Sequence, residues 1–207
     1  MRTNRLEEND DFEHSEIEDI EHHQVDDVAH LEMLYASPSP KVAAKVKPGI
    51  GRNPRLMIEN SRFVVLATVG STGIETSGRG GPPGFVQVED EQTLFLPDLT
   101  GNNRIDSLRN IVKDSRVGLL FLSPDHRQIL RVKGNATISV DSELMLRFQN
   151  GNRLPKSVLI INVTACIIQC ASTKMRAGMW SPPKEDREWW FKRMFDRFAW
   201  VAALKSS

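Results

Sequence analysis

The sequence is poor in several features that mark whole classes of protein. It has 2 cysteines and 1 tyrosine among 207 residues, and no apolar run in it is long enough to span a membrane. Its first residues lack the basic-then-apolar pattern of a secretory signal. No run rich in Lys and Arg is interleaved with aromatic residues, a pattern typical of nucleic-acid-binding segments. These absences favour a cytoplasmic protein that binds neither a membrane nor a nucleic acid.

The two cysteines are badly placed for a disulfide. Cys166 and Cys170 are four residues apart on a predicted strand, which separates their Cα atoms by about 13 Å. A disulfide needs Cα atoms less than about 7 Å apart. We therefore interpret both cysteines as buried small hydrophobic residues, in preference to a redox pair.

Histidine is scarce in the body of the chain, which limits hydrolytic and metal chemistry. Beyond residue 30 the one histidine is His126, and no nucleophile elbow accompanies it, so a hydrolytic triad is poorly supported. The four earlier histidines fit no metal-ligand spacing and lie among carboxylates. They are His14, His22, His23 and His30. We predict no metal site.

Charge is distributed unevenly, although Lys and Arg balance Asp and Glu over the whole chain at 27 each. Residues 1–32 contain twelve acidic and two basic residues, a net charge of −10, which leaves a net charge of +10 on the remainder. Residues 1–25 are acidic, polar and poor in aromatics, and we predict that they form a disordered tail. The basic remainder suits a small anionic ligand.

Segments that favour β structure recur along the rest of the chain, and turn residues bound them. Short connections between successive strands indicate an antiparallel sheet. We therefore predict a mainly β (α+β) fold, an antiparallel barrel with helices at its ends. The predicted strands cover 62–69, 74–77, 85–88, 93–96, 117–122, 128–140 and 156–170, and short helices are predicted at 25–35, 42–46, 56–61 and 141–148.

The main domain is predicted to span residues 26–182, and residues 183–207 are predicted to form a C-terminal amphipathic helix. Trp189 and Trp200 fall on the charged face of this helix. Two exposed tryptophans on one line indicate contact with a partner or another subunit. The alternative is that they fold against nearby chain.

The segment 97–122 contains the most specific chemistry. A strand ends near Pro97, and apolar residues then recur at helical spacing. Asn102 or Asn103 can cap this helix. Unpaired N–H groups at a helix N-terminus attract phosphate, and Arg104 can add a bidentate contact. A capped surface helix without a ligand is the alternative. The apolar positions are Ile105, Leu108, Ile111 and Val112.

Arg109 lies within the same predicted helix, about 40° from Ile105 and beside the apolar stripe. An arginine on that face needs a buried anion or carbonyl partners. Alternatively, its stem covers the stripe while the guanidinium reaches water. The residues alone leave both interpretations open.

A glycine-rich stretch, 78–84, fits no nucleotide-binding motif. Pro82 and Pro83 forbid the helix that a dinucleotide fingerprint requires, and no Gly-Lys-Ser/Thr is present for a P-loop. The glycines permit a flat ligand to approach the backbone, with Arg79 beside it. The alternative is a β-bulge followed by a loop.

The segment after the last predicted strand contains Lys174, Arg176 and Trp180 within seven residues. Two cations and a tryptophan at this spacing can hold a phosphate and cover an aromatic ring. They are equally compatible with an ordinary surface.

Together these segments resemble the pyridoxamine 5'-phosphate oxidase-like flavoproteins. The resemblance rests on VVLATV, SGRGGPPGFVQV, TLFLPDLTGNNRIDSLRNIVKDSRVGLLFL and the later KMRAGMW. It is greatest for an uncharacterised bacterial branch with R-G-x-P-P-G-F-V and P-D-x-x-G-N-N-R motifs, and it covers roughly residues 26–182. The resemblance implies a six-stranded split β-barrel that forms a homodimer with FMN at the subunit interface.

The resemblance also implies roles for particular residues. Ser77 and Arg79 would line the flavin ring, and Asn103 and Arg104 would hold the phosphate. The other subunit would contribute the segment after the last strand. With Arg109, the predicted cofactor-binding set is Ser77, Arg79, Pro97, Asp98, Asn103, Arg104, Arg109, Lys174, Arg176 and Trp180.

The function implied is that of an FMN-dependent oxidoreductase that acts on an unidentified small molecule, with hydride transfer through flavin N5. No catalytic side chain is predicted, because the cofactor performs the redox step. Pyridoxamine phosphate oxidase activity itself is not expected, because the family's C-terminal R-L-H-D-R type element is missing. The alternatives are a flavin-storage protein without turnover and a haem- or deazaflavin-binding member of the same fold.

Overall fold

The computed structural model describes residues 24–99, 101–123, 128–170 and 172. The chain divides into two compact units, Met1–Ala44 and Lys45–Ser207. The first unit contains α2 (Val28–Leu34) and α3 (Pro40–Ala43). Asp27 caps α2, since its side chain accepts a hydrogen bond from the His30 backbone N–H at 2.6 Å. The predicted helix is therefore present, but its apolar side chains, Val28, Leu31, Leu34 and Tyr35, are exposed.

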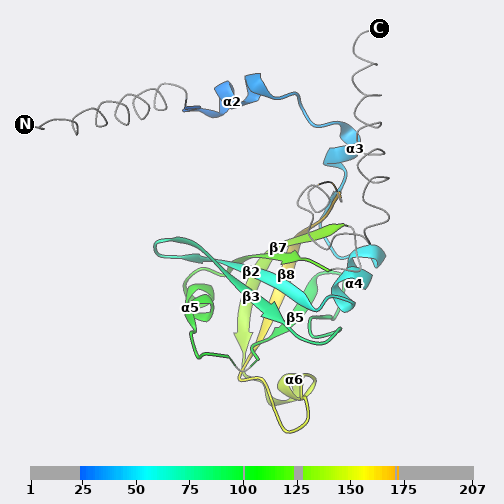
Figure 1. Cartoon of the computed structure of the whole chain (residues 1–207), viewed down its shortest axis with the longest axis vertical. Coiled ribbons are helices and arrows are strands. Elements are labelled where there is room, and N and C mark those ends of the chain that lie inside the picture. Colours follow the sequence, from blue (N-terminus) through cyan, green and yellow to red (C-terminus); the bar gives the residue numbers. More distant parts are fainter. Residues whose placement is uncertain (1–23, 100, 124–127, 171, 173–207) are drawn as a thin grey trace, which may run out of the picture. The chain divides into compact units, whose positions relative to one another are not determined.

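The second unit is built on one antiparallel sheet (Figure 1). Its strand order is β3-β2-β6-β7-β8-β5-β4, and β1 pairs with β8. The strands are β1 (Val46–Lys47), β2 (Phe63–Gly70), β3 (Gly73–Gly80), β4 (Gln87–Val88), β5 (Thr93–Pro97), β6 (Arg116–Phe121), β7 (Ile129–Ser139) and β8 (Val158–Gln169). The helices are α4 (Arg52–Glu59), α5 (Asp106–Lys113) and α6 (Ser142–Leu146). In the part of the chain that the structure describes, the fold is mainly antiparallel β, as predicted.

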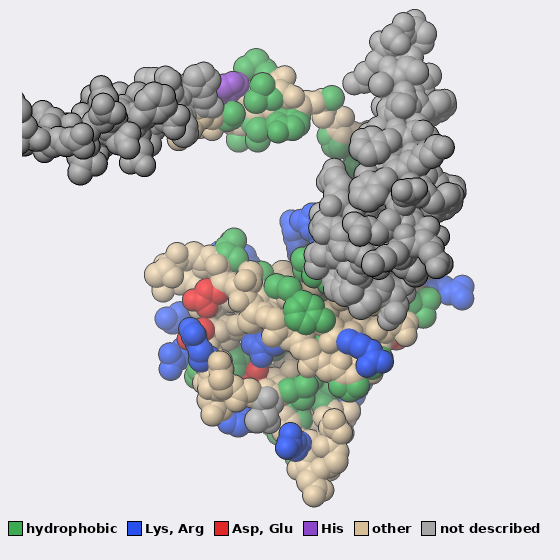
Figure 2. Space-filling view, viewed as in Figure 1, with side chains coloured by type: hydrophobic (Ala, Val, Ile, Leu, Met, Phe, Trp, Pro, Cys, Tyr) green, Lys and Arg blue, Asp and Glu red, His purple; other side chains and the backbone are tan. Residues whose placement is uncertain are grey.

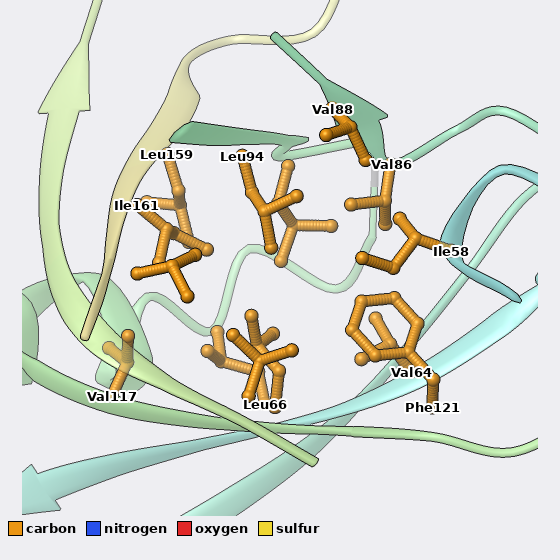
Figure 3. Packing of buried hydrophobic residues seen from close by; sticks show 14 of the residues in the cluster. Ile58, Val64, Leu66, Val86, Val88, Leu94, Val117, Phe121, Leu159 and Ile161 are labelled. Atoms are coloured by element: carbon orange, nitrogen blue, oxygen red, sulfur yellow. The ribbon is translucent and has the colours of Figure 1, made fainter. Parts of the chain in front are cut away.

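The hydrophobic core lies between the two halves of the curled sheet. Alternate residues along the strands point inward, so that Leu66 of β2 and Phe121 of β6 face Leu94 of β5 and Ile161 of β8 (Figure 3). All four side chains are almost completely buried. Burial of each contributes about 1.5–3 kcal/mol to stability. This enclosed interior matches the predicted split barrel.

The β2–β3 hairpin extends further than predicted. The two strands pair from Phe63 opposite Gly80 to Gly70 opposite Gly73. A Cβ on Gly78 would lie 3.1 Å from the Phe63 ring, so the missing side chain lets the strand continue past its predicted end at Ser77. The first part of the glycine-rich stretch is therefore regular strand, and the bulge-and-loop alternative does not apply to residues 78–80.

One further local prediction is wrong, and another is confirmed. The helix predicted at 42–46 ends at Ala43, and Val46 instead pairs with Ile167 as part of β1. This pairing uses the part of β8 that extends beyond β5, where its backbone groups would otherwise lack a strand partner. The predicted cap of the later short helix is confirmed, because the Asp141 carboxylate accepts a hydrogen bond from the Leu144 N–H at 2.8 Å.

The cysteines form no disulfide. Cys166 is buried, and burial raises the pKa of its thiol to about 11, which suits a small hydrophobic residue. Cys170 is exposed, contrary to the prediction, because β8 ends one residue earlier, at Gln169. Within the described ranges, no helix is long and apolar enough to cross a membrane.

Candidate functional site

A cavity of about 830 Å³ lies between β3, the connection from β5 to α5, and the residues before β8. Its lining comprises residues 75–80, 85, 97–99, 101–107 and 156. Six of the ten predicted site residues are among them: Ser77, Arg79, Pro97, Asp98, Asn103 and Arg104. The structure therefore brings together three segments that are far apart in sequence.

Strand pairing joins two walls of the cavity. Pro97, at the end of β5, pairs with Val158, at the start of β8. The Asp98 N–H continues this ladder by donating to the Ser157 carbonyl at 2.8 Å. Asp98 and Lys156 are consequently neighbours on the cavity wall, although 58 residues separate them along the chain.

One face of β3 forms the opposite wall. Glu75, Ser77 and Arg79 are alternate residues of this strand, so their side chains point to the same face. Each of the three bonds to α5 or to the segment before it. This face of the strand therefore meets polar groups, whereas the opposite face carries Gly78 against the Phe63 ring.

Arg79 and Asp98 form a partly buried ion pair across the cavity. An Arg79 guanidinium nitrogen lies 2.7 Å from an Asp98 carboxylate oxygen, and the two side chains are 20% and 18% exposed. Arg79 Nε also donates to Ser77 Oγ at 3.4 Å, and Ser77 Oγ lies 3.2 Å from Ser107 Oγ. These contacts link four side chains into one connected network across the cavity.

The segment before α5 is a turn, and not the capped helix start that was predicted. The helix begins at Asp106, and Ile105 occupies the cap position without a side-chain hydrogen bond. Asn102 Oδ1 accepts from the Arg104 N–H at 3.0 Å. Asn103 has a φ of 59°, a left-handed conformation that asparagine tolerates and that interrupts a helix.

Arg104, a predicted phosphate contact, is largely exposed to solvent. Its side chain is 78% exposed and forms an ion pair with Asp106 at 3.0 Å. Asn103 Oδ1 accepts a hydrogen bond from Lys156 Nζ at 3.0 Å. Figure 2 shows basic and acidic side chains next to one another over the region of α5. This side of the cavity is therefore charged and open to solvent.

The helix α5 lies against the sheet beside β2 and β3 (Figure 1). Ile111 and Leu108 pack on the core, and polar contacts join the helix to both strands. Asn110 is 9% exposed, and its Nδ2 donates to Thr68 Oγ1 at 3.1 Å and to Glu75 Oε2 at 3.0 Å. The predicted apolar stripe is therefore only partly correct. Ile111 is buried, but Ile105 and Val112 are exposed.

Arg109 does not belong to the cavity. Its side chain is exposed, and it is absent from the cavity lining. The solvent-reaching alternative therefore describes its side chain, and Arg109 is not among the residues that we assign to the cavity. The reason is that α5 turns Ser107 and Asn110 toward the strands, which leaves position 109 on the outside of the helix.

Ser107 and Lys156 are among the cavity residues that were not predicted from the sequence. Ser107 could have been suggested by its place in the first turn of the helix, where hydroxyl groups face an incoming anion. Lys156 has no comparable local signal, because only the pairing of β5 with β8 brings it to the cavity. Predictions for Lys174, Arg176, Trp180 and the C-terminal helix lie outside the described residues, as do those for the 1–23 segment and His126.

No group of three or more His, Cys, Asp or Glu side chains suited to a metal ion occurs in the described part of the chain. The polar cavity atoms are instead hydroxyl, amide, guanidinium, ammonium and carboxylate groups. Guanidinium, ammonium, hydroxyl and amide groups are able to bind an organic anion through hydrogen bonds and charge.

The sequence of this mainly β domain matches a known protein family. Residues 53–170, more than half of the chain, match the family described as pyridoxamine 5'-phosphate oxidase. The chain belongs to this family. The resemblance noted from the sequence is thus confirmed. No curated protein sequence matches the chain.

Solved structures show similar chains. HupZ from Group A Streptococcus is 22% identical, and the match covers 55% of this chain and 89% of HupZ with a TM-score of 0.44. General Stress Protein 26 from Bacillus anthracis is 20% identical over 55% of this chain and 88% of its own, with a TM-score of 0.44. An FMN-binding protein from Syntrophomonas wolfei is 13% identical over 55% and 86%, with a TM-score of 0.41.

Proposed function

We propose that the chain is an FMN-binding oxidoreductase and that the cavity beside β3 and α5 is its cofactor site. Family membership indicates the class of cofactor. The observation that supports this site is the convergence of six predicted flavin-contacting residues, from β3 to Arg104, on one cavity. The small-molecule substrate is unidentified, and a cytoplasmic location stays a prediction.

The residues of the cavity fit FMN in size and chemistry. A volume of about 830 Å³ lies within the range of about 300–1,000 Å³ that is usual for cofactor sites. In the described part of the sheet, β3 pairs with β2 alone, so its outer edge offers backbone donors and acceptors to a flat heterocycle. Gly78 and Gly80 carry no side chain that would keep a ring away from this edge.

The charged side of the cavity fits the phosphate. Arg104 and Lys156 supply cationic donors there, and the amide of Asn103 stands beside them. Arg104 is held only by an exposed ion pair with Asp106, which costs little to exchange for a phosphate oxygen. A guanidinium can bind two phosphate oxygens at once.

When bound, FMN would supply two-electron redox chemistry, and the chain's own residues would bind and orient it. The network of Asp98, Arg79, Ser77 and Ser107 fixes the polar wall of the cavity before any ligand enters. A fixed set of donors need not reorganise on binding, which favours affinity and orientation.

We also propose a homodimer in which the other subunit contributes Lys174, Arg176 and Trp180 to the site. The support is that outward-facing residues of β2 and β6, such as Val65 and Leu120, are apolar yet only half-buried. A sheet face of this kind suits a subunit interface. Sedimentation equilibrium tests this directly, and a monomer at micromolar concentration would overturn it.

Two alternatives differ from the proposed function, one in its cofactor and one in its lack of turnover. Haem is disfavoured because the described lining residues include no His, Cys, Met or Tyr to ligate its iron. A flavin-storage protein remains compatible with the same cavity. Reduction of the bound flavin by NADH or NADPH, followed by oxygen uptake, would distinguish an oxidoreductase from a storage protein.

The first test is the visible spectrum and the mass of whatever co-purifies with the full-length protein. Stripped protein is then titrated with FMN and with riboflavin, which lacks the phosphate. We expect a flavin spectrum and tighter binding of FMN than of riboflavin. The absence of any FMN binding would overturn the proposed function.

A further inference from the structure

Three cations line the described part of the cavity, and their partners differ. Arg79 is paired with Asp98, and Arg104 is paired with Asp106. Lys156 instead donates to the neutral amide oxygen of Asn103 at 3.0 Å. Among the described residues that line the cavity, Lys156 is therefore the cation that forms no ion pair with a carboxylate.

The acidic residues of the lining make this difference important. Glu75, Asp98 and Asp106 match the three cations in number, so the formal charges of the described lining sum to zero. Without Lys156 the sum becomes −1, and the cavity would repel an anion. An excess of negative charge in a partly enclosed site opposes anion binding strongly, because protein surroundings screen charge less than water does.

The backbone holds Lys156 in a defined place although its side chain is exposed. The neighbouring Ser157 carbonyl accepts from the Asp98 N–H at 2.8 Å, and the Lys156 N–H lies 3.4 Å from the Asp98 carbonyl. These bonds extend the ladder between β5 and β8. The lysine stem therefore starts from a rigid sheet edge and reaches the connection before α5.

The hydrogen bond to Asn103 holds the ammonium group beside Arg104. An ammonium group has three donors, and this bond uses one, which leaves two for a ligand. Asn103 is also the one non-glycine residue with positive φ in the described chain. The side-chain amide oxygen of Asn103 thus positions the ammonium group of Lys156 on the charged side of the cavity, next to Arg104.

We propose that Lys156 binds the phosphate of the flavin nucleotide and makes the site selective for FMN over riboflavin. This inference rests on the proposed function. Arg104 must leave or share Asp106 to reach a phosphate oxygen, whereas Lys156 gives up nothing more than a bond to a neutral amide. Lys156 is thus the cation that attracts the phosphate, and Asn103 is the residue that positions it.

The test compares stripped wild-type protein with Lys156→Gln in titrations with FMN and with riboflavin. We expect Lys156→Gln to weaken FMN binding at least about tenfold, the effect of one charge-assisted hydrogen bond, and to leave riboflavin binding unchanged. Lys156→Arg should retain most of the preference for FMN. The salt dependence of FMN binding should also decrease in Lys156→Gln.

Two further variants control for charge and for structure. Lys113→Gln removes an equal charge from the exposed end of α5, away from the cavity lining, and should leave both affinities unchanged. Asn103→Gly keeps the left-handed backbone but removes the oxygen that holds Lys156, and it should weaken FMN binding by a smaller factor. Circular dichroism and the thermal midpoint confirm that each variant is folded.

The possible failures are distinguishable. If wild-type protein binds no FMN, the proposed function fails. If it binds FMN and riboflavin equally, the phosphate site fails and the inference with it. If it prefers FMN and Lys156→Gln keeps that preference, the function stands and the role of Lys156 is overturned. An equal loss of both affinities would also overturn it, since the lysine would then act on the ring or on the fold.

Discussion

Two ion pairs of the same chemistry stand on different sides of the cavity and differ in burial. The side chains of Arg79 and Asp98 are 20% and 18% exposed, whereas those of Arg104 and Asp106 are 78% and 41% exposed. The first pair also connects β3 with the residue after β5, while the second joins neighbours in the chain. The more buried ion pair thus joins residues far apart in the sequence, and the more exposed pair joins residues close together.

The comparison teaches that the two arginines suit different tasks. A partly buried guanidinium that loses its carboxylate is left desolvated and unpaired, at a large cost. An exposed pair contributes about 0–1 kcal/mol, because water and ions replace either partner. Arg79 is accordingly a fixed part of the cavity wall, and Arg104 is free to exchange Asp106 for a ligand.

The largest effect is expected for Arg104→Ala. If Arg104 contacts the phosphate, its loss should weaken FMN binding roughly a hundredfold, since charge-assisted hydrogen bonds contribute about 1.5–3 kcal/mol. Riboflavin binding and the free energy of unfolding should change little. The matched control is Arg109→Ala, which removes an exposed arginine outside the cavity. Equal effects of the two substitutions, measured by fluorescence titration, would remove the proposed role.

The buried pair should respond in stability. Asp98→Ala leaves Arg79 without its carboxylate and should lower the free energy of unfolding by about 2 kcal/mol. The value lies below that for a fully buried pair, because about a fifth of each side chain is exposed. Asp106→Ala should cost less than about 1 kcal/mol. Urea denaturation measures both, and similar losses would show that burial does not distinguish the pairs.

A smaller loss of stability is expected when the hydrogen bonds of Asn110, which join α5 to β2 and β3, are removed. Asn110→Ala removes hydrogen bonds to Thr68 and Glu75 and should lower the free energy of unfolding by about 1–2 kcal/mol. The control is Asn135→Ala, which should change stability little. Asn135 is exposed, and its side chain makes a long hydrogen bond of 3.4 Å with Ser115. Thermal unfolding should separate the two alanine variants by several degrees.

The smallest effect is expected for Asp106→Asn. The substitution removes the carboxylate that competes with phosphate for Arg104, and FMN binding should tighten about twofold, consistent with an exposed pair. Loss of a negative charge in the first turn of α5 should cost about 0.5 kcal/mol of stability. Weaker FMN binding would indicate that Asp106 orients Arg104 toward the ligand.

Strands and turns were largely predictable because their signals are local. A β-branched, apolar run predicted β2, and Asp141 caps α6 as its position indicated. The start of α5 was misjudged because Asn102 and Asn103 are good cap residues in general. Here Asn103 adopts a left-handed backbone that delays the helix to Asp106. Local propensity alone does not distinguish a cap from a turn.

The residues that line the cavity were only partly predictable, because some of them come together through contacts between distant segments of the chain. Ser77, Arg79, Asn103 and Arg104 belong to motifs that can be read along the chain. The position of Lys156 follows from strand pairing over 58 residues, which leaves no local trace. The position of Arg109 outside the cavity depends on which face of α5 meets the strands. That face combines the apolar Leu108 and Ile111 with polar contacts of Ser107 and Asn110.

The sequence by itself determined the antiparallel fold, the family and the segments that supply the cavity, because periodicity and turn chemistry act over a few residues. The tertiary structure alone decided which charges neutralise one another there. That choice depends on burial and on distances between atoms far apart in the chain, and it left Lys156 beside a neutral amide while both arginines found carboxylates.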